Sequence, residues 1–227
     1  MGIGGAFTET VAKSLASDGV LKGTADFTGG RKTDVFTGAA KNDIFRGKGG
    51  DDFFFGRGGN DLVLGQNGDD RLEGQNGDDI IRGGKGLDIV RGGNGNDKLT
   101  GDLDADVFVF DTDDDRDVLR DFAADDYLLV IGATDSTGFW LAEDLVGTGT
   151  LADLSAADQV TLGLTVSEAG GHTRIVMSGG TTMVVKNTAA SAIGLDQLAF
   201  TDAGAKAGVN GLEAVTGLDW HFETGWP

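Results

Sequence analysis

The chain has 227 residues, a formal net charge of -19, 40 glycines and no cysteine. This charge disfavours nucleic acids and anionic membranes as partners, and without cysteine the sequence holds neither disulfides nor thiolate metal ligands. The hydrophobic content of 39% predicts a folded chain over most of its length, and no apolar run approaches the ~18 residues of a membrane-spanning helix.

Residues 1–19 form the first predicted element, a short N-terminal helical cap. Phe7, Val11 and Leu15 are spaced to lie on one face of a helix, and Gly19 is placed to end it. The segment lacks the basic and apolar stretches of a cleavable signal peptide, so any export information is predicted to lie elsewhere.

A nine-residue repeat fills residues 20–109. From Gly47 to Thr100 it reads GKGGDDFFF, GRGGNDLVL, GQNGDDRLE, GQNGDDIIR, GGKGLDIVR and GGNGNDKLT, with glycine at the first and fourth positions, aspartate at the sixth and an apolar residue at the eighth. The units before Gly47 lose most of the turn glycines, while the unit at Gly101 keeps Asp106 and Phe108. Weaker units at the ends are typical of a stacked array.

Each unit predicts a tight turn followed by a very short strand. Glycine-rich residues allow backbone angles that side chains disfavour, and the last three residues alternate so that the eighth side chain points inward. Two turns and two strands then complete one coil of 18 residues. The sequence therefore predicts an all-β fold with two parallel sheets around a core too thin to order the turns by burial alone.

The sixth-position aspartates are predicted to form two columns, one along each edge of the stacked coils. Carboxylates stacked at the spacing of a sheet repel one another, whereas a hard cation between successive turns would be coordinated by carboxylate and carbonyl oxygens. One column contains Asp52, Asp70, Asp88 and Asp106, and the other contains Asp43, Asp61, Asp79 and Asp97.

The pattern GGxGxDxUx in these units resembles the RTX, or haemolysin-type, calcium-binding repeat. The resemblance implies a right-handed parallel β-roll that binds Ca²⁺. It also implies that one turn supplies the carbonyls of its second and fourth residues with its aspartate, and that the turn 18 residues later supplies its first and third carbonyls with its aspartate. About five good sites follow, with a weaker one between the turns at Gly38 and Gly56.

The carbonyl ligands that the resemblance implies fall in five sets. The first column would use Lys48, Gly50, Gly65 and Asn67, then Gln66, Gly68, Gly83 and Lys85, then Gly84, Gly86, Gly101 and Leu103. The second column would use Arg57, Gly59, Gly74 and Asn76, then Gln75, Gly77, Gly92 and Asn94.

Residues 110–200 are predicted to form a β-rich C-terminal cap that covers the open edge of the last coil. It opens on Asp117, Leu119, Asp121 and Phe122, which resemble the element that follows the roll in RTX proteins. The acidic run from Asp111 to Asp117 would hold a further ion or form an acidic loop. Strands are predicted at Tyr127–Ile131, Val160–Val166, Thr173–Met177, Thr181–Val185 and Leu195–Phe200. The tail, 201–227, is a candidate secretion-signal region.

The outward-facing seventh position of the repeat is unexpectedly apolar. An exposed apolar column predicts that something covers it. The alternatives are the N-terminal cap or C-terminal region of this chain, or a surface for a second copy or another partner. The column includes Val35, Phe53 and Ile89 on one sheet and Ile44, Leu62 and Ile80 on the other.

No catalytic motif accompanies the repeats, since the sequence has no GxSxG, HExxH or P-loop pattern. We therefore expect a non-catalytic module. The resemblance implies export from a Gram-negative bacterium by a type I system with an uncleaved C-terminal signal, followed by folding on extracellular Ca²⁺. Two alternatives stay open: the C-terminal part of a larger secreted hydrolase, protease or epimerase, and a stand-alone module that adheres to a cell surface or binds a polysaccharide.

Overall fold

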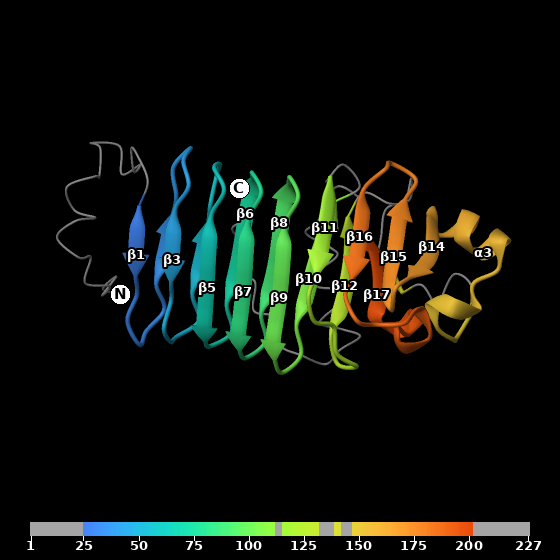
Figure 1. Ribbon diagram of the computed structural model, residues 1–227. Helices are drawn as coiled ribbons and strands as arrows, with labels where there is room; N and C mark the ends of the chain where they lie inside the picture. Colours follow the sequence, from blue (N-terminus) through green and yellow to red (C-terminus); the bar gives the residue numbers. More distant parts are fainter. Residues whose placement is uncertain (1–24, 112–114, 132–138, 142–146, 202–227) are drawn as a thin grey trace.

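The computed structural model describes residues 25–111, 115–131, 139–141 and 147–201. They form an elongated roll in which the strands lie side by side across the long axis, and the chain advances along that axis from β1 to the C-terminal strands (Figure 1). The predicted N-terminal helix and the tail lie outside the described residues. Among the described residues, no helix has the length and apolar character needed to cross a membrane.

Two sheets build the roll. The first sheet contains, in spatial order, β1 (Asp26–Thr28), β3 (Ile44–Arg46), β5 (Leu62–Asn67), β7 (Ile80–Lys85), β9 (Lys98–Leu103), β11 (Arg116–Leu119), β16 (Thr182–Val185), β15 (His172–Met177) and β14 (Leu164–Ala169). The second sheet contains β13 (Phe139–Leu141), β17 (Leu198–Thr201), β12 (Tyr127–Ile131), β10 (Val107–Asp111), β8 (Ile89–Asn94), β6 (Arg71–Asn76), β4 (Phe53–Phe55) and β2 (Val35–Thr37).

Successive strands of the repeats alternate between the sheets, and each pairs in parallel with the strand one coil later. Phe45 is the register partner of Val63, and Val63 is the partner of Ile81. These steps of 18 residues confirm the predicted parallel β-roll and its two-strand coil.

The strands β5 to β9 are longer than the three-residue strands that the repeat predicts. Each continues through the first three residues of the following turn, because those residues also pair across coils. Gln66 is the partner of Gly84, and Asn67 is the partner of Lys85. The turn itself is therefore part of the parallel ladder.

The core is a single file of eighth-position side chains between the two sheets. Phe27, Phe36, Phe45 and Phe54 stack at one end, with neighbouring ring centroids 5.0–5.9 Å apart. The file continues through the fully buried side chains of Val63, Leu72, Ile81, Val90, Leu99 and Phe108. Since each coil contributes only two such side chains, the core is as thin as the sequence predicts.

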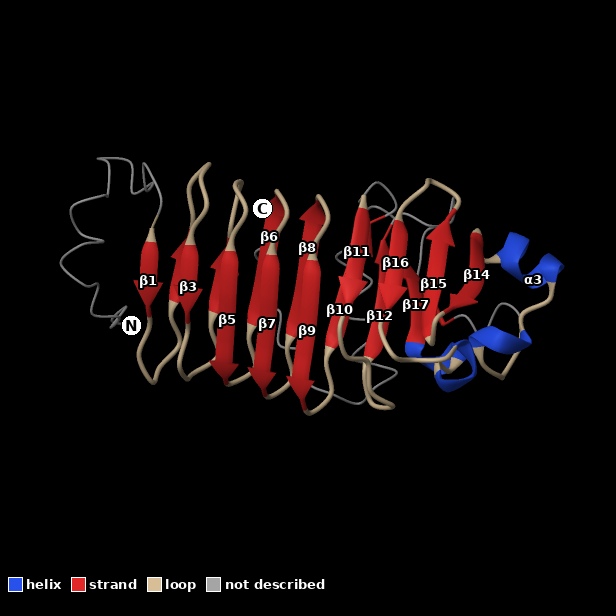
Figure 2. Cartoon of the chain, viewed as in Figure 1, coloured by secondary structure: helices blue, strands red, loops and turns tan. Residues whose placement is uncertain are grey.

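The coil continues beyond the nonapeptides with a longer step. Val118 on β11 is the partner of Lys98 on β9, and Tyr127 on β12 is the partner of Val107 on β10. Both steps are 20 residues. The sheets are then completed by β16 and β17, and the helical turns lie at the end far from β1 (Figure 2).

The predicted strand at Tyr127–Ile131 is confirmed by β12, and the predicted hairpin by the antiparallel pair β15 and β16. The predicted strand at Val160–Val166 is wrong before Leu164, because Val160 and Thr161 end α3 (Ala156–Thr161) and β14 begins at Leu164. Ser155 and Asp158 cap the start of α3 reciprocally, and this local hydrogen bonding favours a helical turn over an extended strand. The predicted strand at Leu195–Phe200 begins instead with the 3₁₀ turn η3 (Leu195–Gln197). Two further 3₁₀ turns, η1 (Leu151–Asp153) and η2 (Ala190–Ala192), flank this region.

The apolar outer column differs between the two sheets. On the second sheet, Ile89, Val107 and Val109 are nearly inaccessible and belong to a separate apolar cluster with Leu129, Ile131 and Ala199. On the first sheet, Ile80 is 42% exposed. The expected cover is therefore present over part of the second sheet, and what supplies it stays a prediction.

Candidate metal centre

Two ladders of buried aspartates run along the edges of the roll. In each ladder, the backbone N–H of one sixth-position aspartate donates to Oδ1 of the aspartate one coil later. The distances in the first ladder are 2.7 Å from Asp52 to Asp70 and 2.8 Å from Asp70 to Asp88. In the second ladder, they are 2.7 Å from Asp61 to Asp79 and from Asp79 to Asp97. The predicted columns are therefore continuous, with all of these carboxylates held inside the turns.

The ladders extend past the repeats into the C-terminal region. The N–H of Asp97 donates to Oδ1 of Asp117 at 2.9 Å, and the N–H of Asp106 donates to Oδ1 of Asp126 at 3.0 Å. Asp121 accepts from the N–H groups of Gly101 and Asp102, both at 3.0 Å. The repeat does not predict Asp126 as part of a ladder, because two extra residues in the coil break the interval of 18.

The second carboxylate oxygen of the ladder aspartates is the unusual feature of the site. It is buried, and among the described residues it has no hydrogen-bond partner. Burying an unpartnered charged oxygen is costly, so a positively charged ligand at these atoms would offset a large penalty. The atoms concerned are Oδ2 of Asp52, Asp61, Asp70, Asp79, Asp88 and Asp97.

First-position glycines leave the space beside these oxygens. A Cβ on Gly65 would overlap Oδ2 of Asp70 and lie 2.9 Å from the carbonyl oxygen of Gly83. The same space at Gly74 lies between Oδ2 of Asp79 and the carbonyl of Gly92, at 2.8 Å from the latter. A carboxylate and a predicted first-position carbonyl ligand from the next coil therefore face one small cradle.

Positive φ angles at the second and fourth positions shape the turns of the repeats from Gly47 onward. They run from Lys48 (φ 77°) and Gly50 (φ 100°) to Asp102 (φ 82°) and Asp104 (φ 77°). Side chains disfavour this region. Five of the turns therefore hold non-glycine residues under strain, namely Lys48, Arg57, Gln66, Gln75, Asp102 and Asp104. The seven turns from Gly47 to Asp106 share the geometry that the sequence predicts for them.

The earlier turns at Gly29 and Gly38 are built differently. Ala39, at a second position, is absent from the described residues with positive φ, and its N–H donates to Oδ2 of Asp43 at 2.8 Å. Oδ1 of Asp43 accepts from the N–H of Ala25 at 2.6 Å. In the same way, the N–H of Gly30 donates a hydrogen bond to Oδ2 of Asp34. Both carboxylate oxygens of Asp43 thus accept hydrogen bonds from backbone N–H groups. Asp43 therefore differs from the six aspartates whose Oδ2 atoms have no hydrogen-bond partner.

Several predicted carbonyl ligands already accept a hydrogen bond. The side-chain amides of Asn67 and Asn76 donate to the carbonyls of Lys48 and Arg57, at 2.7 and 2.9 Å. The third-position carbonyls of Lys85 and Asn94 accept from the N–H groups of Gly68 and Gly77, at 2.9 and 2.8 Å. A carbonyl oxygen has two lone pairs, so each of these keeps capacity for a second interaction.

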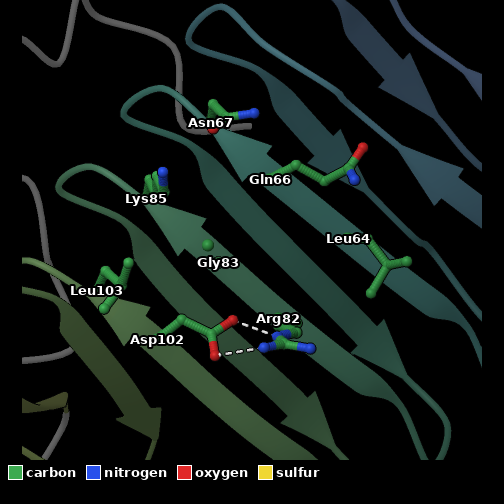
Figure 3. A pocket seen from close by; sticks show the side chains of 9 residues that line it. Leu64, Gln66, Asn67, Arg82, Gly83, Lys85, Asp102 and Leu103 are labelled. Atoms are coloured by element: carbon green, nitrogen blue, oxygen red, sulfur yellow. Dashed lines mark hydrogen bonds and ion pairs between the residues drawn. The ribbon is translucent and has the colours of Figure 1, made fainter.

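Several residues at the second and third positions, such as Gln66, Lys85 and Leu103, are exposed. Figure 3 shows Gln66, Asn67, Lys85 and Leu103 around a pocket of about 550 Å³ on the first sheet, crossed by an ion pair between Arg82 and Asp102. The proposed ligands at these positions are backbone carbonyls, which explains why Gln, Lys, Arg, Leu and Gly can all occupy them.

Burial raises the pKa of the ladder aspartates far above the ordinary value. Desolvation is the largest cause, the backbone N–H of the preceding ladder residue opposes it, and neighbouring aspartates add to the rise. The pKa values are about 6 for Asp97, about 7 for Asp52 and Asp61, about 8 for Asp70, Asp79 and Asp106, and about 9 for Asp88. Without a cation, the carboxyls with pKa values of about 8 and 9 therefore hold their protons at neutral pH, and those of Asp52 and Asp61 are partly protonated.

The donor set fits a hard divalent cation. It consists of carboxylate and carbonyl oxygens, which are the ligands that Ca²⁺ takes. Among the described residues, no point gathers three or more acidic or histidine side chains. This agrees with a site that takes two aspartates from successive coils and completes its shell with backbone carbonyls.

We expect Gly68→Ala to destabilise the calcium-loaded roll by about 3 kcal/mol. Gly68 has φ 122°, and a Cβ there would overlap the carbonyl of Gly50 in the preceding coil. Thermal unfolding in calcium measures the effect. Gly171→Ala is the matched control, because Gly171 has φ 76° but no atom within 4 Å of the added Cβ. Equal losses in both variants would show that close stacking of the turns contributes nothing.

The chain was compared with protein families and with solved structures. Four overlapping copies of the RTX calcium-binding nonapeptide repeat match residues 28–63, 55–90, 64–99 and 85–117. The crystal structure of the extracellular lipase LipA from Serratia marcescens matches with 18% identity and a TM-score of 0.35, over 78% of this chain and 40% of that chain. This chain thus spans less than half the length of that lipase. A comparison with curated proteins found no match.

Proposed function

We propose that calcium binding completes the folding of the roll, because the chain carries RTX calcium-binding nonapeptide repeats over residues 28–117. The observation that carries the proposal is the set of six buried, unpartnered Oδ2 atoms. Each of these oxygens lies beside the first-position glycine of its own turn. A bound Ca²⁺ supplies positive charge that links two successive turns.

The proposed ligands are the sixth-position aspartates with the carbonyls named above, in about five sites. Asp70 would take part in two sites, since it ends one set and begins the next. The cation would replace the protons that these buried carboxyls otherwise hold. Because Ca²⁺ would bind only the folded state, its binding free energy would add to the free energy of folding. The roll would therefore be unstable at low calcium concentrations and stable at roughly 10⁻⁴–10⁻³ M Ca²⁺, the range that suits extracellular modules.

The role that follows is a non-catalytic, secreted module that stays unfolded until it meets calcium outside the cell. The proposal includes export by a type I system from a Gram-negative bacterium, and this part is supported by the match to the RTX repeat family. The alternatives of a larger secreted enzyme, an adhesive module or a polysaccharide-binding module stay predictions, and so does a homodimer.

Equilibrium dialysis of the chain against calcium tests the proposal. We expect several ions to bind per chain at pH 7.5, and magnesium at the same concentration to bind far more weakly, because Mg²⁺ requires a stricter octahedral shell and dehydrates reluctantly. Binding of fewer than two calcium ions, or equal binding of the two metals, would contradict it.

A further inference from the structure

A pocket of about 460 Å³ opens on the first sheet where β9, β11 and β16 lie side by side. Among the described residues, its lining is formed by Lys98, Arg116, Val118, Arg120, Lys186 and Asn187. Four of these six residues are cationic, and none is acidic, in a chain that has 18 basic residues against 37 acidic ones. A concentration of positive charge in so acidic a chain needs an explanation.

The sheet register places the four cationic residues around one apolar residue, Val118. Val118 is the partner of Lys98 on β9, and Arg116 and Arg120 lie two residues to either side of Val118 on the same face. Lys186 follows Val185, the partner of Leu119, so it lies beside Arg120. Arg116 and Arg120 are four residues apart, which is about 13 Å along a strand. The positive charge is therefore spread over two ends of the pocket.

Among the described residues, no ion pair involves these four cationic side chains. The ion pairs among the described residues involve other arginines, namely Arg46, Arg71, Arg82 and Arg91. Lys98 contributes to lowering the pKa of Asp78, although hydrogen bonds from Asn96 are the main cause. The other three, Arg116, Arg120 and Lys186, have no ion-pair partner in the described part of the chain, and Arg116 and Arg120 are exposed. Arg120 and Lys186, which lie side by side, repel each other unless an anion lies between them.

We propose that this pocket binds a ligand with two phosphate groups on a compact scaffold, such as a hexose bisphosphate or a lipid headgroup of the same chemistry. One phosphate lies between Arg120 and Lys186, with the amide of Asn187 beside it. The other is bound by Arg116, and Lys98 lies between the two ends. Guanidinium groups bind phosphate oxygens in pairs, and Val118 packs against the scaffold. This site is separate from the calcium turns.

Isothermal titration with fructose 1,6-bisphosphate, at a fixed free calcium concentration that keeps the roll folded, tests the site. We expect saturable binding that falls at least about tenfold in the double variant Arg120→Gln, Lys186→Gln, because two charge-assisted contacts are lost. The matched control is Arg31→Gln, Lys41→Gln. It makes the same change in net charge at exposed residues near the other end of the roll, and its affinity should equal that of the unaltered chain.

Further ligands separate the sources of the phosphate groups. Fructose 6-phosphate and inorganic phosphate should bind at least about tenfold more weakly than the bisphosphate, because each engages one end only. Vesicles carrying a bisphosphorylated inositol lipid test whether a headgroup is accepted, and stronger binding there than in solution would assign the lipid as the source. Three results would each overturn the proposal. The first is the absence of saturable binding to both fructose 1,6-bisphosphate and the bisphosphorylated lipid. The second is an equal loss of affinity in the two double variants, and the third is an affinity for inorganic phosphate equal to that for the bisphosphate.

Discussion

At calcium concentrations held low by a chelator, we expect the chain to be unfolded at pH 9 and to gain its roll as the pH is lowered towards 5. The ladder aspartates have pKa values of about 6 to 9 in the folded roll, against an ordinary value of 3.8. The folded state therefore binds more protons than the unfolded chain between these limits. The resulting stability is fully present below pH 3.8 and is lost as the pH rises through about 6 to 9. Far-ultraviolet circular dichroism against pH measures this transition.

Saturating calcium should reverse the sign of the pH dependence. Protons and Ca²⁺ compete for the same oxygens, so the loaded roll should lose stability on acidification while the calcium-free roll gains it. The two stability curves should converge only below the pKa values of the calcium-free ladder, at a pH where protons displace the bound cation. A calcium-free chain that is more stable at pH 9 than at pH 6 would contradict the assignment of protons to the buried carboxyls.

Asp70→Asn should affect the loaded and calcium-free states in opposite directions. The new side chain would keep the oxygen that accepts the N–H of Asp52 at 2.7 Å, and its amide nitrogen would face the carbonyl of Gly83 in place of Oδ2. The amide resembles the protonated carboxyl, so the calcium-free roll should be more stable at pH 9. The substitution removes a carboxylate from two proposed sites, so the calcium concentration at the folding midpoint should rise at least about tenfold.

Asp69→Asn is the matched control for this variant. Asp69 is exposed and lies next to Asp70, and its Oδ1 accepts the N–H of Leu87 at 2.8 Å, a bond that asparagine retains. Both substitutions change the net charge equally within one turn. Calcium titrations monitored by intrinsic fluorescence compare them. Equal midpoints in the two variants would mean that charge alone, rather than ligation by Asp70, sets the calcium requirement.

The repeat predicted the core and the ladders because each depends on one position in nine. Phe54 and Leu72 are fully buried, and Asp70 and Asp88 lie one coil apart. The sequence also indicated weak turns before Gly47. It did not indicate that the N–H of Ala39 would donate to Oδ2 of Asp43, because that depends on the φ angle of a single residue.

The C-terminal region was harder to predict because its contacts follow no period. Asp126 continues a ladder across a 20-residue step, and Gln197 donates to the carbonyls of Ala123 and Asp126 from more than 70 residues away. The start of α3 depends on a local capping interaction that outweighs the alternating pattern after Val160. The cationic pocket combines residues from β9, β11 and the end of β16, and only the tertiary register brings them together.

Calcium titration of the metal-stripped chain at pH 8, followed by circular dichroism and sedimentation velocity, tests the central claim most directly. The account predicts a weak β-sheet signal and an expanded chain in EDTA. Added calcium should then produce a cooperative gain of β-signal together with compaction, at roughly 10⁻⁴–10⁻³ M free Ca²⁺. A chain that is already compact and fully β-structured in EDTA at this pH would contradict it.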